Sequence, residues 1–391
     1  MKLFKPRTKD KPAGKNLSRW MMGVVVMTMV GTTTYAGMQP QNVHAAELLS
    51  PGQGRQGRVV MYAYDDGGLA LQDEHAHLID QLNYSFALIK DGEASGDHWK
   101  GVDQVERFLK RNPHIDGVIS VGGWGADGFS DACATAEGRK KLADSMLRLM
   151  DEHGFVGIDI DWEYPGFSSA GIVSRPEDEE NWYELLRLLR LGLDQRQADH
   201  GRDFLLSVAV GCGEEQLQAV DGGRLNDLVD QVVLMTYDLS GHDKITGHHA
   251  GLYPDTDRKN SGSRAVRLLA EDGLSEGKML LGFPAYGRMW RQVTGGGTGL
   301  NQRAATSGNK FVTFDEILAL EGQGYTAHYD EEARAAYWFN GENFVSGENR
   351  RSIDEKVAWL RQNSLLGCAV WCWNNDAHSV MASMLDEALR R

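Results

Sequence analysis

A row of acidic residues inside an apolar segment constrains this chain more than any other feature. Asp159, Asp161 and Glu163 stand two positions apart. Ile158 precedes the first acid, and Ile160 separates the first from the second. Because side chains alternate along a strand, the segment predicts a strand with three carboxyl groups on one face and apolar residues on the other. An apolar outer face is typical of a strand covered by helices, so we expect a buried strand in an α/β protein.

The three acids are expected to perturb one another's ionisation. Burial disfavours the charged form of a carboxyl group, and neighbouring negative charges disfavour it further. At least one of the three is therefore expected to keep a proton near neutral pH and to be able to donate it. A pair of aspartates alone also occurs at metal sites and on solvated edge strands, but the apolar residues around this row favour a group of catalytic acids.

Apolar runs of strand length alternate with helical patterns along the chain. The predicted strands are Val59–Ala63, Leu82–Leu88, Gly117–Val121, Val156–Asp161, Phe204–Val210, Gln231–Thr236, Lys278–Phe283 and Gly367–Trp371. The predicted helices are 102–111, 137–153, 176–200, 263–272, 352–362 and 376–391, with Pro176 in the first turn of its helix. Eight strands in this alternation predict a (β/α)8 TIM barrel of the α/β class. Barrel active sites lie at the carboxyl ends of the strands, and Glu163 follows the end of the fourth predicted strand.

The connection between the seventh and eighth predicted strands is too long for one helix. Three short strand patterns occur in it, at Tyr325–His328, Ala335–Phe339 and Asn343–Ser346, with turn signals between them. We expect an α+β insertion, 289–349, within a catalytic domain, 47–391, and we expect it to form a wall beside the barrel's active end. The glycine-rich loop 295–299 lacks the Lys-Ser/Thr ending of a phosphate-binding loop.

The first 46 residues have the pattern of a signal peptide. Basic residues up to Arg19 precede the apolar run Trp20–Val30, which is short for a membrane span, and Val43-His44-Ala45 fits a cleavage site. We predict a secreted protein, extracellular or in the cell envelope, with no stable membrane partner after cleavage. Cleavage after Ala36 and an uncleaved anchor are the alternatives.

The net charge, the histidines and the cysteines indicate which ligands and cross-links the chain can have. The net charge of −14 argues against nucleic acid as a ligand. His248 and His249 are adjacent and have no acidic partner at ligand spacing, so we expect no metal and no cofactor. The four cysteines lack zinc-site spacing, although one long-range disulfide is left open; they are Cys133, Cys212, Cys368 and Cys372.

Several motifs, in order, resemble the family 18 glycoside hydrolases, the chitinase family. The acidic row resembles the family's D-x-D-x-E signature, and Ser120–Trp124 resembles its S-x-G-G-W. Met235–Asp238 resembles M-T-Y-D, Gly282–Arg288 resembles G-x-P-x-Y-G-R, and Trp371 falls where the family has a tryptophan on strand eight. The resemblance extends over about residues 58–385.

The resemblance implies catalytic roles for four residues. Family 18 enzymes use the substrate's own acetamido group as nucleophile. Glu163 would act as general acid and base, Asp161 would support the acetamido nitrogen, and Asp159 would share a proton with Asp161. Tyr237 would hold the acetamido oxygen in line for attack on C1.

The resemblance also implies a set of substrate-binding residues, with Trp371 as the floor under the sugar. The remaining candidates are Asp238, Met235, Trp124, Tyr62, Tyr286, Arg288, Ser120 and Phe86. Tyr62 and Ser120 are expected to hydrogen-bond the buried Asp159, and Trp124, Tyr286 and Arg288 to flank the cleavage point.

The chain departs from the family pattern at three places. Val156 stands where members often carry an aspartate, Gly347-Glu348-Asn349 replaces a Y-D-D sequence, and the loop Cys372–Asp376 is unusual. These departures bear on substrate preference more than on catalysis.

The leading hypothesis is a monomeric chitinase that cleaves chitin or chito-oligosaccharides with retention at C1. An endo-β-N-acetylglucosaminidase acting on peptidoglycan or N-glycan is the alternative within the same class. A non-catalytic chitin-binding lectin is the alternative from a different class.

Overall fold

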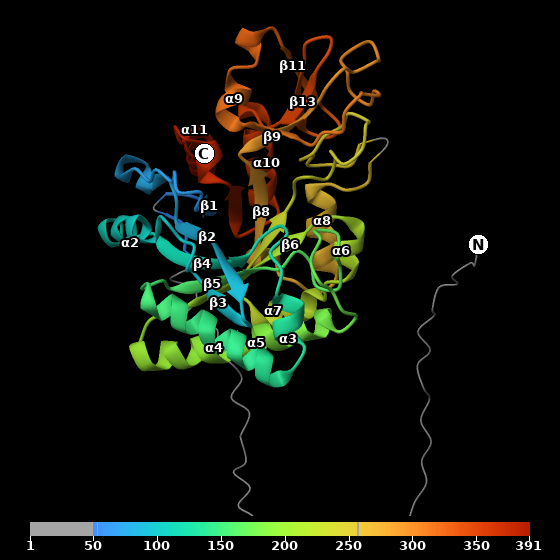
Figure 1. Ribbon diagram of the computed structural model, residues 1–391. Coiled ribbons are helices and arrows are strands. Elements are labelled where there is room, and N and C mark those ends of the chain that lie inside the picture. Colours follow the sequence, from blue (N-terminus) through green and yellow to red (C-terminus); the bar gives the residue numbers. More distant parts are fainter. Residues whose placement is uncertain (1–49, 53, 256–257) are drawn as a thin grey trace, which may run out of the picture. The chain divides into compact units, whose positions relative to one another are not determined.

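Eight parallel strands close into a barrel in the computed structural model, which describes residues 50–391 except 53, 256 and 257 (Figure 1). The barrel strands are β1 (Arg58–Tyr64), β2 (Gln81–Lys90), β4 (Asp116–Gly122), β5 (Gly157–Asp161), β6 (Leu205–Gly211), β7 (Gln231–Met235), β8 (Met279–Pro284) and β14 (Gly367–Trp371). Strand β1 pairs with both β2 and β14, which closes the ring. The predicted (β/α)8 architecture is confirmed, and the short β3 (Glu93–Ser95) pairs antiparallel with β2.

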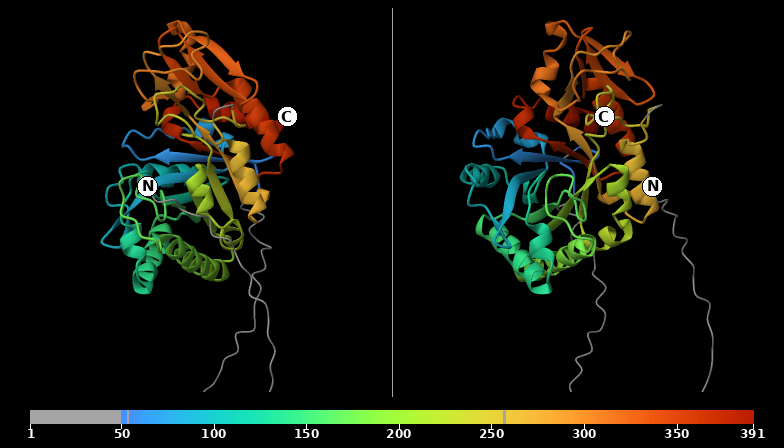
Figure 2. Two further views of the ribbon diagram at one scale, coloured as in Figure 1. Left: turned by 90° about the vertical axis from the view of Figure 1, so that its right-hand side faces the viewer. Right: turned by 45° about the vertical axis from the view of Figure 1, so that its right-hand side comes forward.

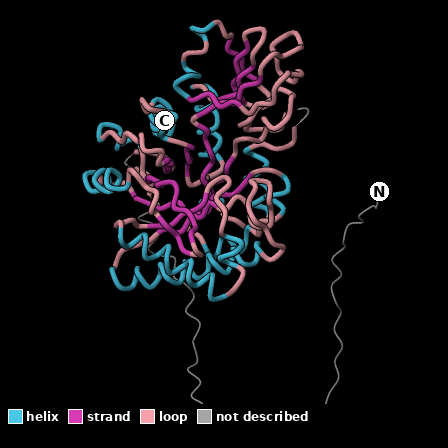
Figure 3. Tube along the Cα trace, in the orientation of Figure 1, coloured by secondary structure: helices cyan, strands magenta, loops and turns pink. Residues whose placement is uncertain are grey.

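Helices surround the strands, as Figure 3 shows by the position of the cyan segments. They are α2 (Val102–Arg111), α3 (Phe129–Cys133), α4 (Ala136–Glu152), α5 (Asp178–His200), α6 (Glu214–Gln218), α7 (Gly222–Leu228), α8 (Gly262–Glu271), α10 (Arg350–Gln362) and α11 (Val380–Arg390). The prediction for Pro176 was wrong, because α5 begins at Asp178. A turn precedes the helix, and the amide of Arg175 donates to the Asp178 carboxylate at 2.7 Å within it.

The insertion forms a second, antiparallel sheet with the order β10-β9-β13-β12-β11. Its elements are β9 (Tyr286–Trp290), β10 (Lys310–Thr313), α9 (Phe314–Leu318), β11 (Thr326–Asp330), β12 (Ala335–Phe339) and β13 (Phe344–Gly347). Figure 2 shows this sheet, in orange, outside the ring of strands and on one side of it. The sheet begins at Tyr286, earlier than the predicted boundary at 289, because β9 follows β8 after a single residue.

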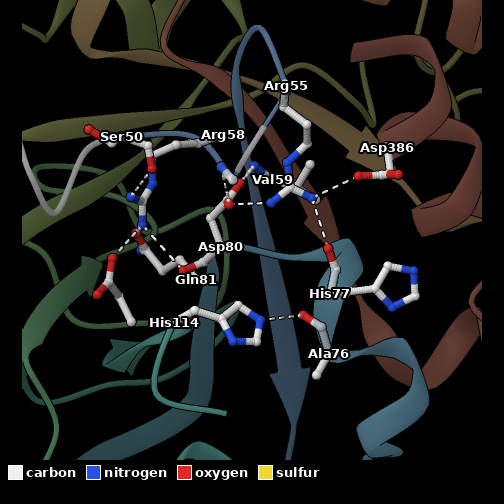
Figure 4. Close-up of polar contacts among 12 residues, drawn as sticks. Ser50, Arg55, Arg58, Val59, Ala76, His77, Asp80, Gln81, His114 and Asp386 are labelled. Atoms are coloured by element: carbon white, nitrogen blue, oxygen red, sulfur yellow. Dashed lines mark hydrogen bonds and ion pairs between the residues drawn. The ribbon is translucent and has the colours of Figure 1, made fainter. Parts of the chain in front are cut away.

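Paired charges close the amino end of the barrel (Figure 4). Arg55 donates to Asp386 at 2.9 Å and to the carbonyl of His77 at 3.2 Å, and it also pairs with Asp80. Arg58, at the start of β1, pairs with Asp116, at the start of β4, at 2.7 Å. We call Arg55, Arg58, Asp80, Asp116 and Asp386 the amino-face network. It ties the segment before β1 to the barrel and to α11.

The sequence predicted a signal peptide and no stable membrane partner, and it left a disulfide open. The predicted signal peptide, 1–46, lies outside the described residues. Across 50–391, leaving out 53, 256 and 257, we find no helix with the length and apolar character that a membrane span requires. All four cysteines are buried and free, so the disulfide left open by the sequence is not formed.

Candidate active site

Strand β5 places its acids inside the barrel. Ile158 and Ile160 pack in the main hydrophobic core. Asp159 and Asp161 alternate with them, and the exposed fraction is 0% for Asp159 and 4% for Asp161. Glu163 follows the carboxyl end of the strand and is 8% exposed. The structure therefore brings the three predicted acids together in a buried row at the active end of the barrel.

Three hydroxyl groups hold Asp159 in place. Ser207 donates to its Oδ1 at 2.6 Å, while Ser120 and Tyr62 donate to its Oδ2 at 2.7 and 3.0 Å. The two serines lie directly beside Asp159 in register, on β4 and β6. Burial raises the pKa of Asp159, and these hydrogen bonds oppose the rise. Both carboxyl oxygens of Asp159, at the inner end of the row, therefore accept hydrogen bonds.

Among the described residues, Asp161 has no such hydrogen bonds, and Glu163 has one, from Tyr164. Oδ1 of Asp161 is buried without a hydrogen-bond partner. Burial, and then the charges of Glu163 and Asp159, raise the pKa of Asp161 well above its ordinary value. Burial raises the pKa of Glu163 to about 7, with the charge of Asp238 adding to the effect and a hydrogen bond from Tyr164 opposing it. The pair therefore retains a proton at neutral pH, in a position to donate it.

Asp238, three residues after the end of β7, differs from Asp161 and Glu163 because basic side chains lie beside its carboxylate. Its two oxygens pair with Nε and Nη2 of Arg288 at 2.7 and 2.5 Å, and Nδ1 of His249 lies 3.5 Å from its Oδ1. Burial favours the neutral acid, but His249 and Arg288 together hold the pKa of Asp238 below its usual range. Asp238 thus stays a carboxylate. Burial, and then the charges of Asp161 and Glu163, raise the pKa of Tyr237, the preceding residue, well above its ordinary value.

Aromatic rings gather around Trp371 at the end of β14. The Trp371 ring centroid lies 5.7 Å from that of Tyr62, 5.4 Å from Phe86 and 6.1 Å from Tyr64. Trp371 also packs against the small interior cluster that contains Met235. Through Tyr62, this aromatic group contacts the acidic row.

The three residues predicted to flank the cleavage point differ in accessibility. Trp124 is 60% exposed and packs edge-on against Tyr164. Tyr286 and Arg288 are buried, and the guanidinium of Arg288 is held by Asp238 and lies 4.3 Å from the exposed ring of Phe311. Trp124 is open to a ligand, whereas Tyr286 and Arg288 belong to the wall behind the site.

The departures from the family pattern have local structural roles. Glu348 is buried, pairs with Lys356 and accepts a hydrogen bond from Ser352 at 2.5 Å, which fastens the start of α10. Asp376 accepts three backbone N–H bonds at 2.8 to 3.1 Å and so caps α11.

The sequence did not point to Ser207 or Phe311 as site residues, and His249 was considered only as a metal ligand. Ser207 is a polar residue within an apolar strand, which is a usable signal, but its position beside Asp159 depends on the register of β5 and β6. His249 and Phe311 come from the connections after β7 and β8, and no local pattern places these connections against the barrel. Within the described part of the chain, no group of three or more histidine, cysteine or acidic residues has a metal-binding arrangement.

The site has a buried acid with a raised pKa at the carboxyl end of a (β/α)8 barrel, next to a group of aromatic rings. This combination is typical of glycoside hydrolases. The model of the glycosyl hydrolases family 18 matches residues 58–376, and the chain belongs to this family.

Curated relatives and solved structures agree with this assignment. Chitinase A1 of Niallia circulans is 30% identical, over 80% of this chain and 50% of the relative. Chitinase 1 of Aphanocladium album is 30% identical, over 71% of this chain and 67% of the relative. A family 18 N-acetylglucosaminidase from Paenibacillus barengoltzii is 31% identical, with a TM-score of 0.82, and the match covers 85% of this chain and all of that one. The chain spans only half the length of the first of these relatives.

Proposed function

We propose that the protein is a chitinase that cleaves β-1,4-linked N-acetylglucosamine chains by a substrate-assisted, retaining mechanism. The observation that carries the proposal is the Asp161–Glu163 pair, which is buried, unpaired with any cation among the ion pairs of the described residues, and raised in pKa. The chitinase names of the relatives support chitin as the substrate.

In the first step, Glu163 gives its proton to the glycosidic oxygen as the bond to C1 breaks. The acetamido oxygen of the same sugar attacks C1, which forms an oxazolinium ion and keeps water out of this step. Asp161 accepts the acetamido N–H and stabilises the positive charge, for which its unsatisfied Oδ1 is available. Tyr237 holds the acetamido oxygen on the attacking line.

In the second step, Glu163, now a carboxylate, takes a proton from water. The hydroxide attacks C1 from the face that the leaving group vacated, and the C1–O bond of the oxazolinium ring breaks to restore the acetamido group, so the configuration at C1 is retained. Asp159 keeps its hydrogen bonds from three hydroxyl groups, and its charge contributes to the raised pKa of Asp161. Trp371 supplies the apolar floor beneath the reacting sugar.

The test is product analysis on N-acetylchito-oligosaccharides, with peptidoglycan and N-glycan beside them and Glu163→Gln as the blank. We expect chito-oligosaccharide cleavage by the wild type and none by the variant. Release from peptidoglycan or N-glycan alone would contradict the proposed substrate. An oxazoline-mimicking thiazoline should inhibit, and indifference to it would contradict participation of the acetamido group.

One neighbour favours a second candidate. The Paenibacillus structure is described as an N-acetylglucosaminidase, and its whole chain is covered by the match. An N-acetylglucosaminidase activity would show itself as release of single sugars in place of longer fragments. The lectin alternative has a neighbour too, a chitinase-like agglutinin from Robinia pseudoacacia at 26% identity and a TM-score of 0.74. Turnover that Glu163→Gln abolishes would exclude a lectin.

Export and a monomeric state belong to the same proposal. The basic and apolar pattern of residues 1–46 supports secretion. N-terminal sequencing of the exported protein tests the cleavage site, and light scattering tests the oligomeric state.

A further inference from the structure

Tyr64 is an exposed aromatic residue that the proposed mechanism does not use. It ends β1 with 43% of its surface exposed, while the six residues before it in the strand are buried. Its ring lies 6.1 Å from Trp371 and 6.3 Å from Phe86, centroid to centroid. The ring therefore extends the aromatic surface of Trp371 outward from the acidic row.

Asn374 fixes the backbone of Tyr64. The Tyr64 amide donates to Oδ1 of Asn374 at 3.0 Å, and Nδ2 of Asn374 donates to the Tyr64 carbonyl at 2.9 Å. One side-chain amide thus satisfies both backbone groups of Tyr64, as a neighbouring strand would. The two residues are far apart in sequence, and Asn374 lies in the loop where the chain departs from the family pattern.

The loop that carries Asn374 is itself anchored. Trp373 is buried, and its indole N–H donates to the carbonyl of Ala70 at 3.2 Å. Asp376, two residues after Asn374, caps α11. Because both sides of Asn374 are held, its amide is a fixed point against which Tyr64 is positioned.

We infer that Tyr64 is a sugar-stacking residue for the saccharide unit next to the one over Trp371, and that Asn374 is its positioning residue. Flat rings bind the apolar faces of pyranose sugars, and an aromatic residue that is already ordered loses little conformational entropy on binding. The inference rests on the proposed function, because it places Tyr64 relative to the sugar on Trp371. It makes Tyr64 a determinant of chain-length preference and leaves the chemistry at C1 to the acidic row.

The experiment measures kcat/KM on N-acetylchito-oligosaccharides from the disaccharide to the hexasaccharide. Tyr64→Ala should lower the value for the longest substrate roughly tenfold relative to the shortest that is cleaved, whereas Tyr64→Phe should stay within about twofold of wild type. Asn374→Ala should move the same ratio in the same direction, and Asn374→Asp, which keeps the acceptor and loses the donor, should do so less. Tyr253→Ala removes an exposed tyrosine that lies on the outer surface beside α8 and is the matched control; its ratio should not change.

The outcomes separate this inference from the proposed function. Wild type that cleaves no chito-oligosaccharide would overturn the proposed function. Cleavage by wild type with an unchanged length ratio in Tyr64→Ala would overturn the inference alone. An increased preference of Tyr64→Ala for long chains would also overturn it, because the ring would then be a barrier. Equal loss on all lengths would place Tyr64 at the reacting sugar, against the inference.

Discussion

The two ends of the barrel both bury acidic side chains, but they treat them differently. At the amino end, Asp80 and Asp386 share Arg55, and Asp116 pairs with Arg58. At the carboxyl end, no ion pair among the described residues joins Asp161 or Glu163 to a cation, and burial raises the pKa of each. A paired acid serves stability, whereas an unpaired acid costs stability and keeps a proton that chemistry can use. The same residue type thus has two roles, set by its partners.

The largest expected effect comes from an unpaired acid. Asp161→Asn should lower kcat on a chito-oligosaccharide by about 100- to 1000-fold, because the amide cannot balance the positive charge that develops on the sugar. It should not lower the free energy of unfolding, since a neutral amide of the same shape replaces a buried acid whose Oδ1 has no hydrogen-bond partner. Steady-state kinetics and urea unfolding check the two halves. Normal turnover would contradict the assignment of Asp161 to catalysis.

Removing a cation from the amino-face network should have the reverse result. Arg55→Met should lower the free energy of unfolding by about 3–5 kcal/mol, because Asp80 is left buried without a cation and Asp386 keeps only Arg390. The kcat of the folded fraction should stay close to wild type.

The exposed pair Lys140–Asp144 provides the matched control. Lys140→Met should change the unfolding free energy by less than about 1 kcal/mol. A large loss of kcat in folded Arg55→Met would show that the two ends of the barrel are not independent.

The pH dependence of stability should differ between wild type and a variant that lacks the Glu163 carboxyl group. The pKa of Glu163 is raised to about 7 in the folded protein from an ordinary value of 4.5. Below the unfolded pKa the acid is protonated in both states and does not destabilise the folded protein. As pH rises to about 7 and above, the cost of ionising the buried carboxyl group is paid in full and the folded protein loses stability. Glu163→Gln should be more stable than wild type at about pH 8, by about 3 kcal/mol, and close to it at about pH 5. Denaturant unfolding at the two pH values measures this, and an equal difference at both would contradict the raised pKa.

A smaller effect is expected at Asp159. Ser207→Ala removes the donor to Oδ1 and should lower the free energy of unfolding by about 1–3 kcal/mol. It should also lower kcat less than Asp161→Asn does, because Asp159 acts through its neighbour. Ser145→Ala, which removes a buried hydroxyl that bonds the backbone at Ala94, serves as the control for stability without catalysis. A larger loss of kcat in Ser207→Ala than in Asp161→Asn would reverse the assigned roles.

The sequence was sufficient for the barrel and the acidic row because both depend on local periodicity. Asp159 and Asp161 face inward by strand alternation, and Tyr62 and Ser120 were placed by motifs. Ser207 depends on the register between β5 and β6, which no local pattern specifies. The contact of His249 with Asp238 and that of Asn374 with Tyr64 join distant loops, so they follow from tertiary packing. The start of β9 was missed because the segment 282–288 continues the apolar pattern of β8.

The pH dependence of kcat/KM on a chito-oligosaccharide tests the central claim most directly, namely that the unpaired acids at the carboxyl end supply the proton. Because Glu163 must carry its proton to begin the reaction, activity should fall on the alkaline side with an apparent pKa near 7, a value that belongs to the Asp161–Glu163 pair. An alkaline limb near the ordinary glutamate value of 4.5, or a rate that keeps rising above pH 7, would contradict the account.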